Sequence, residues 1–286
     1  MTFSHPRVLA FTLLVVAAMW SPLLLAAEPV KWTVTLGDPL RESLGPSKDR
    51  KSRMADIAKE RLLSRLDTAR VKDAVVKVLP SGDLAVEFRA KETLDWYRGL
   101  LLSPGNVEVR PVYTYGFNWM SLASDLPTSV EFRGENPQPD FLWSNDRTAL
   151  EETIKRIKTP EFVFAVGPDT AGWRSYTLGQ AVGGSAELKK VKVRKSSGGM
   201  AYVTLSISTS VVDRLAASEL SEVQDWAIVL DGEVVSVVPK ETLFKGKLEL
   251  TAPARLTSRE ESATWARQVA GRMAAQMPVP IAVIQE

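Results

Sequence analysis

The sequence predicts an α+β protein with two successive units on antiparallel sheets, each with the element order β-α-β-β-α-β. The clearest observation is a predicted hairpin over residues 226–239, in which Asp231-Gly232 separates two apolar runs. Asp-Gly in this position favours a type I′ turn, because both central residues of that turn need positive φ. Nearly every residue of the two runs is apolar, so we expect both faces of the hairpin to be covered. Helical patterns at 209–223 and 258–277 flank the hairpin and would supply part of this cover.

The first unit is predicted over residues 28–115 from alternating strand patterns and one amphipathic helix pattern. In that helix, apolar residues recur at three- and four-residue spacing with charged residues between them, which is typical of one buried face. Pro80-Ser81-Gly82-Asp83 predicts a turn, because Pro presets φ and Gly supplies positive φ. We expect strands at 32–36, 74–79, 84–88 and 107–113, and helices at 53–66 and 90–102. This is the order of a split βαβ, or ferredoxin-like, unit.

Residues 116–160 are predicted to form an ordered connection between the two units, with one short helix at 147–157. The segment is rich in Pro, yet it also carries several aromatic residues, which a disordered linker would lack. The candidate residues for binding a client polypeptide are Phe117, Trp119, Phe141 and Trp143. They would serve this role as a partly exposed apolar patch. The alternative is that they pack between the domains, since aromatic side chains dominate cores by buried area.

The second unit is predicted over residues 161–286 and repeats the order of elements with one added strand. Besides the hairpin, we expect strands at 162–166, 188–194, 201–207, 247–251 and 281–284, and helices at 209–223 and 258–277. Thr257-x-x-Glu260 predicts a capping box, in which the Thr oxygen and the Glu carboxylate bind free backbone N–H groups. A basic run is predicted to lie on the solvated face of a strand; it consists of Lys189, Lys190, Lys192, Arg194 and Lys195. Contact with phosphate or lipid headgroups is the less favoured alternative for this run.

The N-terminal residues 1–27 are predicted to be a signal peptide. Arg7 precedes an apolar run, which leads to the small residues Ala26-Ala27 at the expected cleavage zone. An uncleaved anchor is the alternative, but Pro22 and the shortness of the apolar run disfavour it. No later stretch reaches the about 18 apolar residues that a membrane span needs. We therefore expect a soluble mature protein that is periplasmic or otherwise extracytoplasmic.

The composition excludes several classes of site. The chain has 286 residues, no Cys, and a single His that lies in the predicted signal peptide. Ser-His-Asp, Cys-His and His-based metal sites are therefore excluded from the mature chain, and we expect no cofactor, no metal and no enzyme activity. The net charge of +2 gives no reason to expect nucleic acid as a partner. The adjacent acids Glu151-Glu152 and Glu260-Glu261 point about 100° apart on a helix, so a carboxylate-based hydrolase is the least favoured function.

Three segments within residues 226–286 carry a resemblance to a known family. They are AIVLDGEVVS at 227–236, Leu256-Thr257-x-x-Glu260 at the start of a helix, and MPVPI at 277–281. In these segments the chain resembles the head of the first periplasmic domain of SecD, a family of protein-export subunits. Residues 51–113 resemble the base of that domain in the order of elements only. The resemblance implies a fold with a base and a head, and a role in holding polypeptide chains.

Two departures from the SecD family limit what the resemblance implies. The family carries transmembrane helices with proton-relay acidic residues, and no such segment is found in this sequence. Leu243-Phe244-Lys245-Gly246 stands where the family usually has small or Gly-rich residues. Proton-driven pulling is therefore not implied.

Three functions are consistent with the sequence. The first is an extracytoplasmic binding module resembling the SecD head, which assists export or holds unfolded chains by strand addition. Its partner would be an unfolded or translocating polypeptide, or the export machinery. The second is a structural or interaction protein of the cell envelope with a dedicated folded partner. The third, and least favoured, is the carboxylate-based hydrolase.

Overall fold

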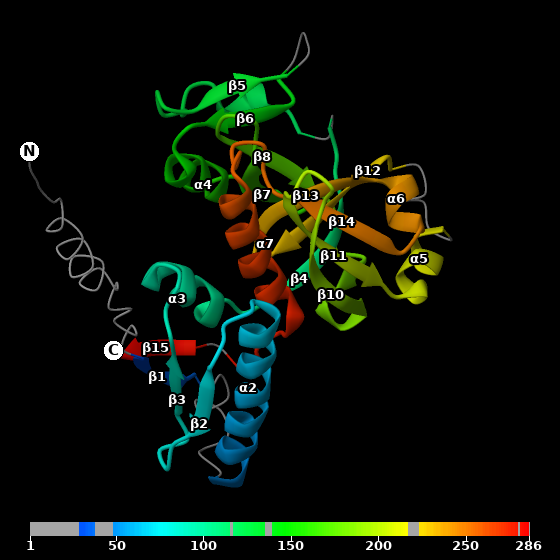
Figure 1. Cartoon of the computed structure of the whole chain (residues 1–286). Helices are drawn as coiled ribbons and strands as arrows, with labels where there is room; N and C mark the ends of the chain where they lie inside the picture. The colour runs from blue at the N-terminus through cyan, green and yellow to red at the C-terminus, as the bar shows by residue number, and fades with distance from the viewer. Residues whose placement is uncertain are drawn as a thin grey trace, which may run out of the picture.

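The structure is a computed structural model that describes residues 29–37, 48–114, 117–134, 139–216, 223–279 and 281–285. The predicted signal peptide, residues 1–27, lies outside the described residues. The described strands form one four-stranded, one three-stranded and one eight-stranded sheet (Figure 1). Helix α7 (Arg259–Ala274) contacts strands of the three-stranded sheet and the two helices that accompany the four-stranded sheet. Almost all strand pairs run antiparallel, so the chain is an α+β protein, as its sequence predicts.

The four-stranded sheet has the order β15-β1-β3-β2, and all its neighbouring strands run antiparallel. Its strands are β1 (Val30–Leu36), β2 (Val75–Val78), β3 (Leu84–Phe88) and β15 (Ile281–Gln285), and it is accompanied by helices α2 (Lys48–Thr68) and α3 (Leu94–Leu102). We call these six elements the base. The apolar stripe of α2 includes Leu62 and Leu66, which are buried in one core with Trp32, Phe88 and Tyr97. The helical spacing of α2 in the sequence thus marks the face that is buried.

The strand that closes the base differs from the sequence prediction. Residues 107–113 are expected to close this sheet, but β4 (Val107–Pro111) pairs with β12 (Asp225–Leu230) in the eight-stranded sheet. The last strand of the chain, β15, lies beside β1 in its place. Both segments are short apolar strands, so local pattern does not distinguish them. The choice depends on burial, because Val107 and Val109 lie in the core around β12.

The eight-stranded sheet has the order β5-β6-β8-β7-β13-β12-β4-β9 among the described residues. Its other strands are β5 (Glu131–Arg133), β6 (Phe141–Ser144), β7 (Val163–Pro168), β8 (Trp173–Leu178), β9 (Gly183–Gly184) and β13 (Glu233–Pro239). The helix expected at 147–157 is α4 (Arg147–Lys155), and a 3₁₀ turn, η1 (Trp119–Leu122), precedes β5. The segment between the predicted units therefore contributes strands to the largest sheet of the molecule.

The predicted hairpin is formed by β12 and β13. Asp231 and Gly232 have φ of +53° and +85°, so both central residues have the positive φ that a type I′ turn requires. Both faces of β12 are buried, as expected: Trp226 and Ile228 lie in one core, and Val229 lies in another with residues of β7 and β8. This burial explains why the strand is apolar on nearly every residue.

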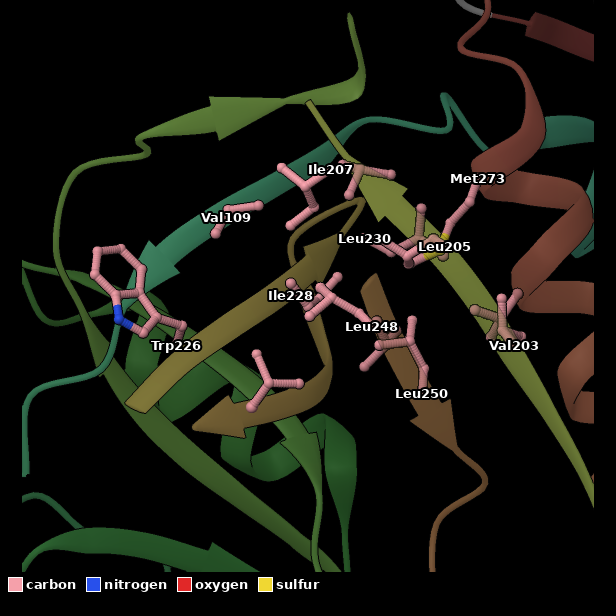
Figure 2. Close-up of a cluster of buried hydrophobic side chains, with 14 of the residues drawn as sticks. Val109, Val203, Leu205, Ile207, Trp226, Ile228, Leu230, Leu248, Leu250 and Met273 are labelled. Atoms are coloured by element: carbon pink, nitrogen blue, oxygen red, sulfur yellow. The ribbon is translucent and has the colours of Figure 1, made fainter. Parts of the chain in front are cut away.

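The three-stranded sheet covers one face of the hairpin. It consists of β10 (Leu188–Lys195), β11 (Ala201–Ile207) and β14 (Lys247–Thr251), in that order. Figure 2 shows Leu205 of β11 and Leu248 of β14 close to Leu230 and Ile228, and Val203 of β11 belongs to the same core. The sequence places all strands of the second unit in one β-α-β-β-α-β order with an added strand, whereas the structure divides them among all three sheets. A strand with two apolar faces needs a layer on each side, and the three-stranded sheet provides one of them.

Helix α7 connects the two cores. Its Val269 and Met273 lie in the core of the hairpin, while Met277, just beyond the helix end, lies in the core of the base. The sequence predicts this helix over 258–277, three residues longer than observed at its C-terminal end. The two smaller helices of this part are α5 (Thr209–Ala216) and α6 (Lys240–Phe244), and a 3₁₀ turn, η2 (Ser185–Glu187), precedes β10. For the helix expected at 209–223, residues 217–222 lie outside the described residues.

Candidate functional site

Of the four aromatic residues proposed from the sequence, Trp119 and Trp143 are buried, and Phe117 and Phe141 are half-buried. Trp119 in η1 is 1% exposed, and its ring packs edge-on against Phe117 and Phe164, with centroids 4.8 and 5.4 Å away. These rings belong to a core that also contains Leu142 and Leu150. The expectation of a partly exposed patch is therefore wrong for Trp119. The reason is that β5, β6 and α4 form a core of their own, which the sequence pattern does not reveal.

The two aromatic residues of β6 are covered by arginine side chains. The guanidinium of Arg133 lies 3.4 Å from the ring centroid of Trp143, which is 6% exposed. The guanidinium of Arg174 lies 3.8 Å from the ring centroid of Phe141. Stacking of this kind is a favourable cation–π contact. A client polypeptide would have to displace these arginines to reach either ring.

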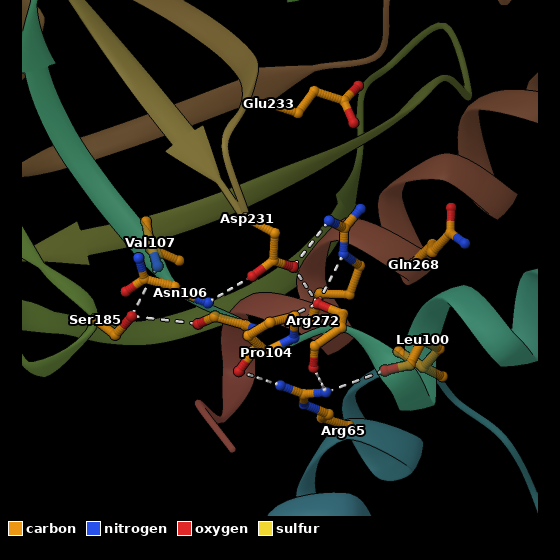
Figure 3. Close-up of polar contacts among 12 residues, drawn as sticks. Arg65, Leu100, Pro104, Asn106, Val107, Ser185, Asp231, Glu233, Gln268 and Arg272 are labelled. Carbon is orange, nitrogen blue, oxygen red and sulfur yellow. Dashed lines mark hydrogen bonds and ion pairs between the residues drawn. The ribbon is translucent and has the colours of Figure 1, made fainter. Parts of the chain in front are cut away.

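Polar residues from several elements meet at the turn of the hairpin (Figure 3). The Asp231 carboxylate accepts hydrogen bonds from the Asn106 backbone N–H at 2.8 Å, from the Ser103 hydroxyl and from Arg272 Nη2 at 2.9 Å. Arg272 Nε also donates to Ser103 Oγ at 3.0 Å. The predicted structural turn thus binds the loop after α3 and the last turn of α7 at the same point.

Arg65 of α2 completes this arrangement and is fully buried. Its guanidinium donates to four backbone carbonyls: Ala275 at 2.7 Å, Leu100 at 3.2 Å, Ser103 at 2.5 Å and Pro104 at 2.8 Å. Burial lowers the pKa of Arg65 to about 10, although the nearby Asp231 carboxylate acts in the opposite direction. A pKa of about 10 leaves the group charged at neutral pH. We call Arg65, Ser103, Asn106, Asp231 and Arg272 the junction.

The sequence contains a signal for the junction, a charged residue on an apolar helix face. Arg65 lies between Leu62 and Leu66 on the apolar stripe of α2, where a charged residue is out of place. A buried arginine needs several hydrogen-bond acceptors, and the carbonyls at the end of α3 provide them. The partners themselves are distant in the sequence. Arg65 and Ala275 are 210 residues apart, so no local rule could join them.

The capping box of α7 lies one residue later than predicted. Thr257 and Glu260 were the expected pair, but Ser258 is the N-cap and accepts from the Glu261 backbone N–H at 3.0 Å. The Glu261 carboxylate in turn accepts from the Ser258 backbone N–H at 3.0 Å, which lowers the pKa of Glu261. Two overlapping boxes are present in the sequence, since both Thr257-x-x-Glu260 and Ser258-x-x-Glu261 fit the pattern. Residue 258 has the extended backbone that an N-cap requires.

A cleft of about 670 Å³ opens between the base and the rest of the molecule. One wall is α2 of the base, the other is η2 with the start of β10, and the end of α7 lies between them. Its apolar lining includes Ile57, Leu188, Val191, Met273 and Met277, and its cations are Arg61 and Lys190. None of the described residues that line the cleft is acidic. The lining of the cleft is therefore mixed, with more polar than apolar surface, and its charged side chains are all cationic.

Several features of the cleft mark it as open to a ligand. Ile57 is 39% exposed and gives the α2 wall an apolar side chain that is accessible from the cleft. Lys190 has φ of +55° at an irregularity in the pairing of β10 with β11, and such strain in a non-glycine residue is concentrated at functional sites. β10 is also an edge strand, because it pairs with β11 alone among the described strands. An edge strand can accept an added strand.

One residue of each acidic pair proposed from the sequence has a structural role. Glu151 forms an ion pair with Arg147 at 2.6 Å on α4, and Glu261 belongs to the capping box. Within the described ranges, no group of three His, Cys, Asp or Glu residues could hold a metal ion. No helix in the described part of the chain has the length and apolar character to cross a membrane.

Comparisons with known proteins agree with this architecture. No family model and no curated protein matches the chain. A crystal structure of SecDF in its Super-membrane-facing form matches with a TM-score of 0.51 at 18% identity, over 95% of this chain and 33% of that one. The fold is SecDF-like. The resemblance predicted from residues 226–286 is thus confirmed at the level of the fold, and it extends over most of the chain.

Two further solved structures are similar at lower scores. One is described as a membrane component SecDF that enhances protein export, with a TM-score of 0.46 and 18% identity over 90% of this chain and 99% of that one. The other is SecDF, a translocon-associated membrane protein from Thermus thermophilus, with a TM-score of 0.33 and 17% identity over 95% and 34%. This chain spans about a third of the length of the SecDF chain in the Super-membrane-facing form.

Proposed function

We propose that this protein is an extracytoplasmic, SecD-like binding module that holds extended polypeptide in the cleft between the base and β10. The observation that carries the proposal is the composition of the cleft: the exposed side chain of Ile57 on α2, cations without any acidic residue in the described lining, and an edge strand opposite. The SecDF-like fold agrees with this role. The role requires no catalytic residue, cofactor or metal.

The lining suits a client without a fixed shape. Ile57 offers exposed apolar surface to side chains of different shapes, whereas Met273 and Met277 belong to the two cores and expose little of their surface to the cleft. Strand addition to β10 would give affinity through the main chain, and the apolar lining would give weak selectivity for side chains. Both interactions are independent of a particular client sequence. The site therefore fits an unfolded or translocating polypeptide better than one folded partner.

The proposal also includes a site of action outside the cytoplasm and a division of the chain into a base and a head. Residues 1–27 direct the chain out of the cytoplasm, and the export machinery is the partner that delivers the client. The base is a ferredoxin-like subdomain in which β15 takes the place of β4, in agreement with the order β15-β1-β3-β2. The remaining sheets form the head, which carries the β10 wall of the cleft.

Site-specific crosslinking tests the proposal directly. The chain has no Cys, so a single engineered Cys can carry a photoactivatable maleimide. Ile57→Cys places the probe in the cleft, and Leu94→Cys is the matched control, since Leu94 is also a helical residue and is 37% exposed. We expect a reduced, unfolded model protein to crosslink to the first variant and not to the second. Equal crosslinking at both positions would contradict a client site in the cleft.

A binding measurement separates contact from affinity. Ile57→Ser removes an apolar side chain from the cleft wall and should weaken binding of the unfolded protein about fivefold, which corresponds to about 1 kcal/mol. Leu94→Ser should leave the affinity unchanged, and both variants should melt close to the wild type. If the wild type binds no unfolded chain but co-purifies with one folded envelope protein, the dedicated-partner function replaces this proposal.

A further inference from the structure

The outer face of the three-stranded sheet carries an unbalanced positive charge. The alternation of β11 buries Val203 and Leu205 and turns Tyr202, Thr204 and Ser206 outward. The strand register places Arg194 opposite Tyr202 and Lys192 opposite Thr204 on β10, and Lys247 opposite Ser206 on β14. These cations therefore share the outward face with the three hydroxyl side chains.

A shallow hollow of about 220 Å³ lies on this face. Four cations line it, Lys190, Lys192, Arg194 and Lys247, against a single carboxylate, that of Glu249. Their net charge of +3 exceeds the +2 of the whole chain. No salt bridge involves any of these four cations within the described part of the chain, although other surface cations, such as Arg214 and Arg267, are paired. The positive charge is thus concentrated here and has no internal partner.

The backbone of β10 adds to this concentration. Its pairing with β11 is irregular between Lys189 and Lys192, and Lys190 has φ of +55°. As a result Lys189 and Lys190 are both exposed, where regular alternation would turn one of them inward. An irregular strand pairing of this kind redirects side chains. A positive φ is energetically unfavourable for a residue other than glycine. The strain is consistent with a surface that presents lysines to a ligand.

We propose that this face docks on a bilayer that contains anionic phospholipids. Cations two residues apart on a strand are about 7 Å apart, so the row on β10 reaches several phosphates at once. The neighbouring Ser206 hydroxyl can donate to a phosphate oxygen, whereas that of Thr204 donates to the Lys192 carbonyl. The modest charge of the whole chain does not match a nucleic-acid-binding protein. Docking would place the client cleft beside the membrane, because Lys190 lines both the cleft and the hollow.

Vesicle binding by the full chain tests this inference. The probe is a vesicle of equal parts phosphatidylcholine and phosphatidylglycerol, compared with phosphatidylcholine alone. The triple variant Lys192→Gln, Arg194→Gln, Lys247→Gln removes three exposed cations that do not line the cleft. We expect it to bind the anionic vesicles at least tenfold less tightly than the wild type, since each cation near such a surface adds about a fivefold factor. The triple variant should bind the unfolded client as tightly as the wild type does. A negative result for vesicle binding would therefore leave the proposed client binding intact, and the reverse also holds.

The matched control is Lys72→Gln, Lys77→Gln, Lys158→Gln, which removes the same charge from exposed positions elsewhere. It should bind vesicles like the wild type, and any contribution of the N-terminal segment is common to all variants. Equal loss in both triple variants, or equal binding to both vesicle types, would overturn the inference. Full displacement by millimolar glycerol phosphate would show a site for free phosphate. Preferential binding of a single-stranded oligonucleotide would show a nucleic-acid surface instead.

Discussion

The junction and the cleft both lie between the base and the rest of the molecule, but their arginine side chains have opposite environments. Arg65 and Arg61 are one turn apart on α2. Arg65 is fully buried and donates to four carbonyls, whereas Arg61 is exposed at the cleft and has no ion pair among the described residues. The junction thus satisfies its polar groups internally, and the cleft leaves its groups available. One interface is divided into a part that fixes the base and a part that can bind.

This difference predicts that substitutions separate into two classes. Changes in the junction should lower stability, because they leave buried groups without partners. Changes in the cleft should leave stability nearly constant and alter binding. Three further experiments test this division.

The largest effect is expected for Arg65→Met. The substitution leaves the carbonyls of Leu100, Ser103 and Ala275 without their donor and should lower the free energy of unfolding by about 3 to 5 kcal/mol. Arg61→Met, one turn away, should change it by less than about 0.5 kcal/mol. Urea unfolding of the two variants measures both values. Similar values for the two arginines would remove the distinction between junction and cleft.

A pair of glycine substitutions isolates packing at the junction from backbone strain. Gly105 and Gly232 have φ of +72° and +85°, so Ala is strained at both positions. At Gly105 the added Cβ would also lie 2.6 Å from the Arg272 carbonyl and 2.9 Å from the Ala275 carbonyl, whereas at Gly232 it meets no atom. We expect losses of about 2 to 3 kcal/mol for Gly105→Ala and about 1 kcal/mol for Gly232→Ala. The reverse order in chemical melts would show that the junction can open to admit a methyl group.

The smallest effect is expected at low pH for Glu187→Gln, in the 3₁₀ turn that forms one wall of the cleft. The Gly184 backbone N–H, with Arg214, lowers the pKa of Glu187 in η2 below its ordinary value of 4.5. A lowered carboxylate pKa stabilises the fold above about pH 4.5, and this contribution is lost as the pH falls further. Glu187→Gln should therefore lose less melting temperature than the wild type between about pH 6 and pH 3. If the melting temperatures of the two proteins fall by the same amount over this pH range, the charged form of Glu187 does not stabilise the wall of the cleft.

The two regions also differ in how far the sequence could predict them. The positive φ at Asp231-Gly232 was predictable because it depends on two adjacent residues. The burial of Leu62 and Leu66 was predictable because helical spacing is local. The other partners of Asp231 were not predictable, since Ser103 and Arg272 lie more than a hundred residues apart in the chain. The cleft likewise combines walls from α2 and β10, which no pattern connects.

The sequence by itself determined the hairpin, the main helices and the α+β class, and its segment 226–286 predicted the SecDF-like fold. These features follow from backbone preference and from the periodicity of apolar residues. Only the tertiary structure decided that β15 closes the base, that Trp119 is buried and that Ser258 is the N-cap of α7. In each case two choices were locally equivalent in the sequence. They were two strands that could close the base, two environments for an aromatic residue, and two overlapping capping boxes. Burial against distant parts of the chain selected the strand and the environment, and the extended backbone at residue 258 fixed the cap.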